Sequence, residues 1–429
     1  MRRLLLTFVV LLALPAGASA RGLTTGFFDG QFSGGTEANV RLDEARASGA
    51  GLVRIGVSWA GVAPGKPAQP TDPADPGYRW GTVDAAVSAA TARGLQVLLS
   101  IDGAPAWAEG RHRPKRFRQG TYKPSPTAIG AFATALGRRY ASSVDYVQLF
   151  NEPNLNTYLS PQWVTRHGRQ RPFAATRYRA MLNAAYPGVH AAGMKLVTAG
   201  TAPYGDSGRD GNRTHPVVFW RTVLAKPVRF DVLAHHPYSV GGPRQHALSK
   251  LDVAVPDVHR LVSLVRGAVR QGRALPHRSK RFWVTEISWD SKPPDPLGVP
   301  ARRHARWLAD SFFVLWKQGI DHVLWYQVRD QPSGGAFAAT NQSGVYLKDG
   351  TPKLAQRAFA FPFSCERHGS GTRFWFKAPA AGRVSVVDSS GRVVRQVTPG
   401  SDRVGTATVG GRSTLHAELG AQKSITCRA

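Results

Sequence analysis

Residues 144–154, VDYVQLFNEPN, contain the stretch that decides the fold. An apolar run rich in β-branched and aromatic residues reaches Phe150 and stops at Asn151, Glu152 and Pro153. Such a run is typical of a buried strand in a parallel sheet. Because a proline interrupts both strands and helices, we expect Glu152 to project from the carboxyl end of this strand. In an α/β barrel, that end of the strands carries the functional side chains.

A second stretch has the same build. Residues 281–291, RFWVTEISWDS, form an aromatic and aliphatic strand with one carboxylate, Glu286, near its end. Two separate strands would therefore deliver Glu152 and Glu286 to one mouth. Glycoside hydrolysis requires such a pair, because one carboxyl group protonates the leaving oxygen and the other stabilises or attacks the anomeric carbon.

The chain from residue 23 to residue 360 alternates strand-like and helix-like segments. The expected strands are 23–29, 51–57, 95–101, 144–150, 194–200, 230–236, 282–286 and 322–328. The expected helices are 36–49, 80–93, 126–140, 174–192, 216–224, 252–272, 301–318 and 352–360. Eight such pairs predict a (β/α)8 TIM barrel. The alternative is a doubly wound open sheet, but residues 26–35, GFFDGQFSGG, lack the glycine-rich phosphate fingerprint of that fold.

The texture of the sequence changes after residue 360. Short β-prone segments at 373–377, 383–387, 392–397 and 406–409 are separated by Gly, Ser, Pro and Asp. They predict a small antiparallel β-domain over residues 361–429, following a barrel over 21–360. The only two cysteines, Cys365 and Cys427, bracket this segment, and we expect a disulfide bond to close it. Two unrelated buried thiols are the alternative.

The first twenty residues match a secretory signal peptide. Arg2 and Arg3 precede the short apolar run LLLTFVVLLAL, and Ala18, Ser19 and Ala20 follow it. This pattern predicts cleavage before residue 21 and a secreted protein. The apolar run is too short for a membrane span, and no later segment approaches eighteen apolar residues.

The chain carries a formal net charge of +29. Arginine-rich clusters occur at 111–118, 166–171 and 278–281, of which the first two are expected at the barrel mouth and the third at its opposite end. One interpretation is a generally basic solvated surface. Another is a mouth that selects uronic or otherwise anionic glycans. Nucleic-acid binding is not expected, because no nucleic-acid motif accompanies the charge.

With these residues in view, the sequence resembles the retaining glycoside hydrolases of clan A, which include families 5 and 39. In that clan an Asn-Glu pair ends the fourth strand and a Glu ends the seventh, matching Asn151, Glu152 and Glu286. The resemblance implies that Glu152 is the acid/base and Glu286 the nucleophile, roles that the residues alone do not assign. It also implies an enzyme with no metal and no organic cofactor.

Five supporting positions follow from the same resemblance. Arg54 would pair with the carboxylates, and Asn151 would bind the 2-hydroxyl group of the sugar. His236 and Tyr238 resemble the His-x-Tyr pair after strand six, in which the tyrosine orients the nucleophile. Trp325 resembles the aromatic platform under the sugar. The structural alternatives are a plain ion pair, a turn-forming Asn, a core histidine and a core tryptophan.

Five further residues are weaker candidates. Trp59, Trp107 and Trp289 follow strands and could line the cleft, and Asp29 and Asp102 end strands and could bind hydroxyl groups. Taken together, the sequence predicts a secreted retaining β-glycosidase acting on an oligosaccharide or polysaccharide. The alternatives are a barrel that binds envelope or matrix glycans without cleaving them, and a secreted nucleic-acid-binding protein. The sequence leaves the sugar, the linkage and the oligomeric state open.

Overall fold

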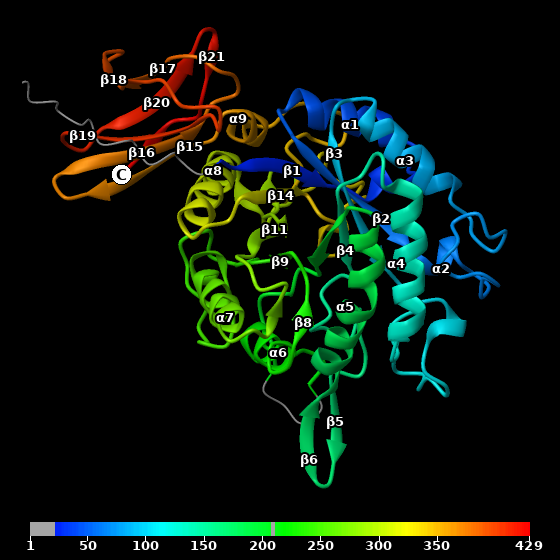
Figure 1. Ribbon diagram of the computed structural model, residues 1–429. Helices are drawn as coiled ribbons and strands as arrows, with labels where there is room; N and C mark the ends of the chain where they lie inside the picture. Colours follow the sequence, from blue (N-terminus) through cyan, green and yellow to red (C-terminus); the bar gives the residue numbers. More distant parts are fainter. Residues whose placement is uncertain (1–21, 207–210) are drawn as a thin grey trace, which may run out of the picture.

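The computed structural model describes residues 22–206 and 211–429, so the predicted signal peptide lies outside the described residues. Eight parallel strands close into a barrel in the order β1-β14-β11-β9-β7-β4-β3-β2 (Figure 1). These strands are β1 (Thr24–Phe28), β2 (Leu52–Ser58), β3 (Gln96–Asp102), β4 (Tyr146–Leu149), β7 (Lys195–Thr198), β9 (Val232–His235), β11 (Arg281–Ile287) and β14 (His322–Tyr326). The predicted TIM barrel is therefore confirmed.

Helices surround the strands as the alternating pattern predicts (Figure 1). They are α1 (Ala38–Ala47), α2 (Trp59–Val62), α3 (Gly81–Thr91), α4 (Pro126–Tyr140), α5 (Phe173–Ala191), α6 (Pro216–Val223), α7 (His259–Arg270), α8 (Ala301–Lys317) and α9 (Leu354–Ala360). Local sequence fixes some ends. Ser125 caps α4 by accepting a hydrogen bond from the Ala128 N–H, and Pro126 occupies the first turn. By contrast α7 starts at His259, later than predicted, because a short 3-10 helix precedes it.

Successive residues of each barrel strand face opposite cores. One core lies inside the barrel and consists of Leu52, Leu98, Val197, Val232, Ala234, Trp283 and Leu324. The larger core lies between strands and helices and includes Val53, Val97, Val147, Val284 and Trp325. Since side chains alternate along a strand, these two sets decide which polar residues face the barrel axis.

Several short elements were not predicted. The hairpin of β5 (Trp163–Arg166) and β6 (Arg169–Pro172) extends away from the barrel and contains the second arginine-rich cluster (Figure 1). Its residues are mostly exposed on both faces, so the sequence lacks the apolar alternation that signals a strand. Short strand pairs also form between β8 (Val228–Arg229) and β10 (Ala274–Leu275) and between β12 (Ser291–Lys292) and β13 (Val299–Pro300). Four 3-10 helices complete the described barrel region: η1 (Gly30–Ser33), η2 (Ala106–Ala108), η3 (Val255–Asp257) and η4 (Phe337–Ala339).

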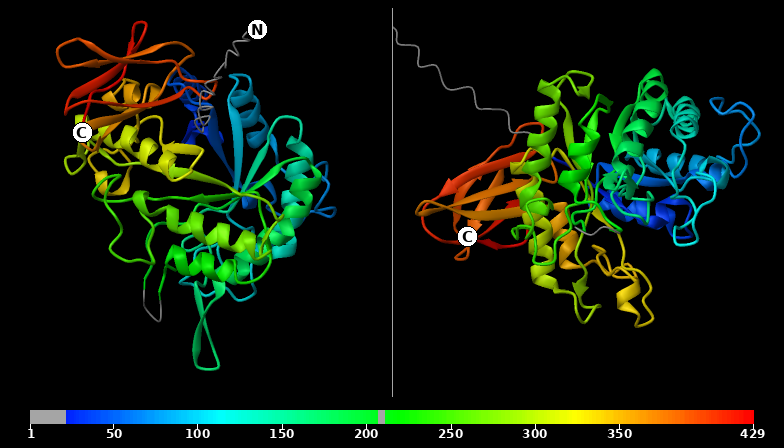
Figure 2. Two further views of the ribbon diagram at one scale, coloured as in Figure 1. Left: turned by 60° about the vertical axis from the view of Figure 1, so that its left-hand side comes forward. Right: turned by 90° about the horizontal axis from the view of Figure 1, so that it is seen from below.

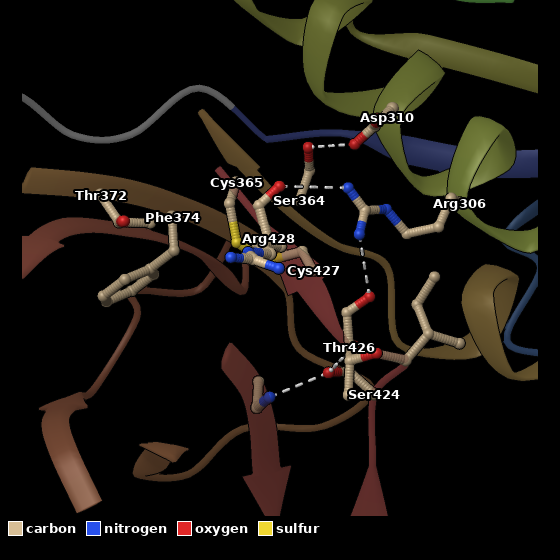
Figure 3. Close-up of a disulfide and its surroundings, with 12 residues drawn as sticks. Arg306, Asp310, Ser364, Cys365, Thr372, Phe374, Ser424, Thr426, Cys427 and Arg428 are labelled. Atoms are coloured by element: carbon tan, nitrogen blue, oxygen red, sulfur yellow. Dashed lines mark hydrogen bonds between the residues drawn. A yellow bond between two sulfur atoms is a disulfide. The ribbon is translucent and has the colours of Figure 1, made fainter. Parts of the chain in front are cut away.

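Antiparallel sheets form the region after α9, as predicted. One contains β15 (Phe363–His368), β16 (Gly371–Lys377) and β19 (Val404–Val409). The other contains β17 (Val384–Asp388), β18 (Val393–Val397), β20 (Thr414–Leu419), β21 (Gln422–Lys423) and β22 (Cys427–Arg428). A disulfide bond joins Cys365 on β15 to Cys427 on β22 and so links the two sheets (Figure 3). The predicted pairing of the cysteines is confirmed.

The C-terminal sheets pack on one flank of the barrel, as both views of Figure 2 show. The Trp375 ring lies 5.8 Å from the Phe313 ring and 6.0 Å from the Trp316 ring of α8. Lys317 of α8 forms an ion pair with Glu366 at 2.8 Å. Trp375 belongs to the same buried cluster as the outer barrel core, so this contact extends the hydrophobic core across both regions.

Among the described residues, none of the helices combines the length and the apolar character needed to cross a lipid bilayer.

Candidate active site

The chain after β4 turns sharply toward the barrel axis. Phe150 and Glu152 both have positive φ angles, 72° and 32°, which non-glycine residues rarely adopt. Backbone hydrogen bonds hold this conformation, from Phe150 N–H to the Ile101 carbonyl (2.8 Å) and from Glu152 N–H to the Gly200 carbonyl (3.1 Å). Both partners lie at the ends of neighbouring strands, so the barrel itself positions Asn151 and Glu152.

The end of β11 is also irregular. Its register against β14 shifts between Val284 and Ile287, as at a β-bulge or a similar irregularity. Thr285 is fully buried and bonds to groups inside the barrel, yet its neighbour Glu286 also contacts side chains from the axis. Strict alternation would send Glu286 toward the helices. The register shift therefore explains how two consecutive residues serve the same site.

Arg54 of β2 connects the polar groups of the mouth. Its guanidinium donates to Glu286 Oε2 (3.1 Å), Asn151 Oδ1 (2.7 Å) and Ser100 Oγ (3.0 Å). It is 2% exposed and lies 4.3 Å from the centre of the Phe28 ring. The prediction that Arg54 has an acidic partner is confirmed, since a buried guanidinium is stable only when it is paired.

Glu286 accepts hydrogen bonds at both carboxyl oxygens. The Tyr238 hydroxyl donates to Oε1 at 2.7 Å, and Arg54 donates to Oε2. Burial, and then the negative charge of Glu286, raise the pKa of Tyr238 far above its usual range, so the hydroxyl keeps its hydrogen and remains a donor. Tyr238 thus lies where the resemblance predicts it.

His236 lies between the two carboxyl groups. Its Nδ1 is 3.0 Å from Glu152 Oε1 and 4.0 Å from Glu286 Oε2, so these two oxygens are no farther apart than the sum of those distances. Burial lowers the pKa of His236 to about 3, which leaves the ring neutral at ordinary pH. The contact with Glu152 is therefore a hydrogen bond and not an ion pair. Its neighbour His235 faces the other way, bonding to Thr201 and the Val253 carbonyl.

A chain of hydrogen bonds inside the barrel favours one tautomer of His236. Gln148 Nε2 lies 2.9 Å from the Thr198 carbonyl, which can only accept, so this end of the amide is the NH2 group. The same NH2 group donates to Thr285 Oγ1 at 3.0 Å. The Thr285 hydroxyl hydrogen is then available to His236 Nε2, also at 3.0 Å. This arrangement favours the tautomer in which Nε2 accepts, Nδ1 carries the hydrogen, and Nδ1–H donates to Glu152 Oε1.

Glu152 has a raised pKa. Burial raises its pKa to about 7, and the positive charges of Arg54 and Arg213 only partly oppose this effect. The group is therefore protonated in mildly acidic solution. Because His236 occupies Oε1 as a donor, the acidic hydrogen belongs on Oε2. Glu152 can donate a proton, while Glu286 presents two hydrogen-bonded oxygens.

Asn151 and Tyr158 complete the wall beside Glu152. Asn151 is 7% exposed, and its Oδ1 is already bonded to Arg54. The Tyr158 hydroxyl bonds to the Asn151 side chain; burial and the charges of Glu152 and Glu286 raise the pKa of Tyr158. No pattern in the sequence indicates Tyr158, because this residue follows the NEP motif in an irregular segment. A role for Asn151 at the sugar's 2-hydroxyl group stays a prediction.

The prediction for Trp325 is wrong. Its ring is fully buried between strand and helices, packs near Trp289 and His304, and donates through Nε1 to the Ser343 carbonyl. Leu324 faces the barrel interior, so alternation turns Trp325 outward and Tyr326 inward. The Tyr326 ring stacks on Phe28 (5.4 Å), and burial and the Glu286 charge raise the pKa of Tyr326 to about 12.

The weaker candidates divide in the same way. Trp59 and Trp289 are buried core residues, and Trp107 is half-buried with its Nε1 bonded to the Ala63 carbonyl. Asp29 forms a buried ion pair with Arg41 at 2.9 Å and so has a structural role. Asp102 lies near the site, because the charge of Arg54 reaches it. Burial raises the pKa of Asp102, and the charges of Arg54 and Arg118 oppose this rise. Within the described ranges, no three His, Cys, Asp or Glu side chains converge as metal ligands would.

Comparison with solved structures places this barrel among known architectures. A family 39 glycoside hydrolase from Bacteroides cellulosilyticus WH2 matches with a TM-score of 0.56 and 16% identity, over 91% of this chain and 80% of that one. A glucosidase from Croceicoccus marinus matches with a TM-score of 0.53 and 14% identity, over 93% of both chains. A protein of family 5, subfamily 18, from Bifidobacterium longum subsp. infantis matches with a TM-score of 0.53 and 15% identity, over 79% of this chain and 78% of that one.

No protein-family model and no curated protein matches the sequence. At these low identities the structural likeness establishes the fold. The resemblance to clan A is thus confirmed as a shared architecture, a (β/α)8 barrel found in glycoside hydrolases of families 5 and 39.

Proposed function

We propose that this protein is a secreted retaining glycoside hydrolase that cleaves β-linked glycans. The observation that carries the proposal is the pair of carboxyl groups on either side of His236 Nδ1, at 3.0 and 4.0 Å, in opposite environments. Retaining enzymes hold their two carboxyl groups about 5 to 5.5 Å apart, one protonated and one ionised. Burial raises the pKa of Glu152 to about 7 and so favours its protonated form, while Arg54 and Tyr238 bind the two oxygens of Glu286.

The contacts support a double displacement. In the first step Glu152 Oε2–H gives its proton to the glycosidic oxygen, and a Glu286 oxygen attacks the anomeric carbon as that carbon–oxygen bond breaks. A glycosyl ester on Glu286 results, and the leaving sugar departs with the proton. In the second step the ionised Glu152 takes a proton from water, the water oxygen attacks the anomeric carbon, and the ester bond breaks. Both carboxyl groups end in their starting states.

Other observations are consistent with this reaction. The half-buried rings of Tyr326 and Phe28 offer apolar faces at the mouth, where a sugar ring can stack. The structural neighbours include a glucosidase and glycoside hydrolases of families 5 and 39, which favours a carbohydrate substrate. Export follows from the charged and apolar pattern of residues 1–20, a sequence argument alone.

Intact-protein mass spectrometry with 2-deoxy-2-fluoro glycosides tests the proposal. We expect one of the activated glucosyl, xylosyl, mannosyl or glucuronyl donors to add one glycosyl group to the wild-type protein and none to Glu286→Gln. Peptide mapping should place the adduct on Glu286. If no donor labels a folded sample and a broad set of polysaccharides is left intact, a barrel that binds glycans without hydrolysis becomes the better description.

A further inference from the structure

A large cleft lies beside Glu152 rather than over both carboxyl groups. Its volume is about 1100 Å³, and its walls come from residues 114–123 after β3, from 155–165 and Gln170 after β4, and from 211–213 after β7. β3, β4 and β7 are neighbours in the barrel, whereas Glu286 lies on β11, beyond β9. The cleft therefore occupies the Glu152 side of the mouth.

The cleft adjoins the chemistry directly. The Leu155 N–H donates to the Glu152 carbonyl at 2.9 Å, and Leu155 is part of the cleft wall. Arg213 and Arg118, also in the wall, lie close enough for their charges to act on Glu152 and Asp102 respectively. In the proposed reaction Glu152 protonates the leaving oxygen, so the departing part of the substrate lies on this side.

The charge of the cleft has one sign. Arg116, Arg118, Lys123 and Arg213 line it, and the described lining includes no Asp or Glu. None of these four forms an ion pair with a described carboxylate, although nearby Arg113 pairs with Glu109 at 3.4 Å. Unpaired cations that line a concave wall concentrate a positive potential where an anion can bind.

Aromatic residues also line the cleft. The Phe117 and Tyr122 rings stack at 5.5 Å, and Lys123 Nζ lies 4.8 Å from the centre of the Tyr122 ring. Trp163 at the base of the β5–β6 hairpin also lines the cleft, and its buried Nε1–H has no hydrogen-bond partner among the described residues. These rings form part of the cleft wall, and a cation–π contact with Tyr122 holds the Lys123 ammonium beside it.

We propose that this cleft binds the leaving-group portion of an anionic glycan, through the carboxylate or sulfate groups of its sugars. The inference rests on the proposed function, because that function assigns the Glu152 side to the leaving group. It places the anionic groups of the substrate away from Glu286 and next to the unpaired cations. A generally basic surface predicts no such preference for one cleft.

Binding measurements test the cleft without requiring catalysis. The cleft variant replaces Arg116, Arg118 and Lys123 by Gln and leaves Arg213 in place, because the charge of Arg213 reaches Glu152. The control variant replaces three exposed arginines of α7 and α8, Arg266, Arg270 and Arg303, by Gln. Both variants lose the same charge, so bulk electrostatics affects them equally.

Calorimetry at fixed ionic strength then compares hexagalacturonate, a sulfated dextran oligosaccharide, cellohexaose and single-stranded DNA. We expect an acidic oligosaccharide to bind about tenfold more weakly to the cleft variant than to wild type, and the control variant to bind within about twofold of wild type. Binding of hexagalacturonate alone would identify carboxylates as the recognised groups, and binding of the sulfated dextran alone would identify sulfates. Equal losses in the two variants, equal binding of cellohexaose, a matching loss for DNA, or no binding of either acidic probe would overturn the proposal.

Kinetic measurements test whether the cleft binds the leaving group. The ratio of kcat/KM for the acidic oligosaccharide to kcat/KM for an aryl glycoside of the same donor sugar should fall about tenfold in the cleft variant and remain unchanged in the control. An unchanged ratio in the cleft variant overturns the assignment. Labelling of Glu286 is scored separately. A protein that binds the acidic probe through the cleft but is never labelled contradicts the enzymatic function and leaves the binding site intact.

Discussion

At the scale of single residues, the two carboxyl groups differ because their partners differ. Glu286 accepts from a buried guanidinium and a phenol, whereas Glu152 contacts a neutral imidazole and has no ion pair with Arg or Lys among the described residues. Burial disfavours the ionised form of Glu152. One site thus holds two identical side chains in different environments.

The pH dependence of the reaction follows from Glu152. Its pKa is raised to about 7, and the proposed first step needs the protonated form. We therefore expect kcat/KM for a glycoside with a poor leaving group to decline with unit slope as the pH rises through about 7. Steady-state kinetics across this range checks the limb. Glu152→Gln should lack it, and a limb that persists in that variant would assign the titration to another group.

Stability should depend on the same group. A pKa raised from 4.5 to about 7 means that the folded protein favours protonated Glu152, so this contribution to stability is complete below pH 4.5 and is lost as the pH rises through about 7. Glu152→Gln removes the penalty of a buried charge. It should raise the free energy of unfolding by about 3 kcal/mol at pH 8 and change it little at pH 4. Denaturant titrations at both pH values measure the difference, and an equal gain at both would contradict it.

Thr285 tests the orientation of the acidic hydrogen. Without its hydroxyl group, nothing requires His236 Nε2 to accept, and Nδ1 can then accept the hydrogen of Glu152 instead of donating to it. Thr285→Val should lower kcat about tenfold, part of the roughly 10²–10⁴-fold that a positioned acid supplies, and should move the alkaline limb to higher pH. Thr285→Ser keeps the hydroxyl group and should keep both values. If kcat falls but the alkaline limb of the pH profile does not move, Thr285 contributes to packing only.

At the scale of elements, β14 shows that two adjacent residues of one strand can belong to different environments. Trp325 and Tyr326 are adjacent, yet one belongs to the outer core and the other faces Glu286. The sequence HVLWYQV is apolar on both faces, as in other buried parallel strands, so it contains no alternation that could decide between the two rings. The resemblance to clan A therefore predicted an aromatic ring at the correct end of the strand. It named Trp325, whereas the next residue, Tyr326, is the one that lies at the mouth.

Substitutions at these two positions should have different effects. Tyr326→Ala removes a ring at the mouth and should lower kcat/KM about tenfold, while Tyr326→Phe retains the ring and most of the activity. Trp325→Ala leaves a cavity in a fully buried core and should lower the free energy of unfolding by about 3–5 kcal/mol. Kinetics and denaturant titration of all three variants separate the effects. Large loss of stability in Tyr326→Ala would argue that its ring serves packing.

At the scale of the whole molecule, the C-terminal sheets and the barrel share one buried surface. Trp375 packs on α8, and the Lys377 ammonium lies 3.3 Å from the Thr25 hydroxyl group at the start of β1. Thr25 lies at the start of β1, whereas Glu152 follows the end of β4 and Glu286 lies near the end of β11. We therefore expect this region to support stability rather than the chemical steps.

The disulfide bond allows that expectation to be measured. It joins residues 62 positions apart, and opening it gives the unfolded chain more freedom. Replacing Cys365 and Cys427 by Ser should cost about 2–4 kcal/mol of stability and leave kcat at 25 °C within about twofold of wild type. Thermal unfolding with and without reductant checks the result, since reductant should affect only the wild-type protein. A variant that is folded but inactive at 25 °C would link the β-domain to the site.

The sequence by itself determined the order of strands and helices, the strand-end positions of Glu152 and Glu286, the pairing of the two cysteines and the class of fold. These features depend on local patterns, such as apolar runs, a proline after a strand and paired cysteines around one segment. Tertiary structure alone decided that Arg54 bonds to Glu286, 232 positions away, and that Thr285 bonds to His236 Nε2. It also decided that Tyr326 replaces Trp325 at the mouth and that four cations without an ion-pair partner among the described residues line one cleft. These groups are placed by the closure of the barrel, by the register shift in β11, and by which residues of β14 face the barrel axis. Local sequence patterns do not indicate any of these three features.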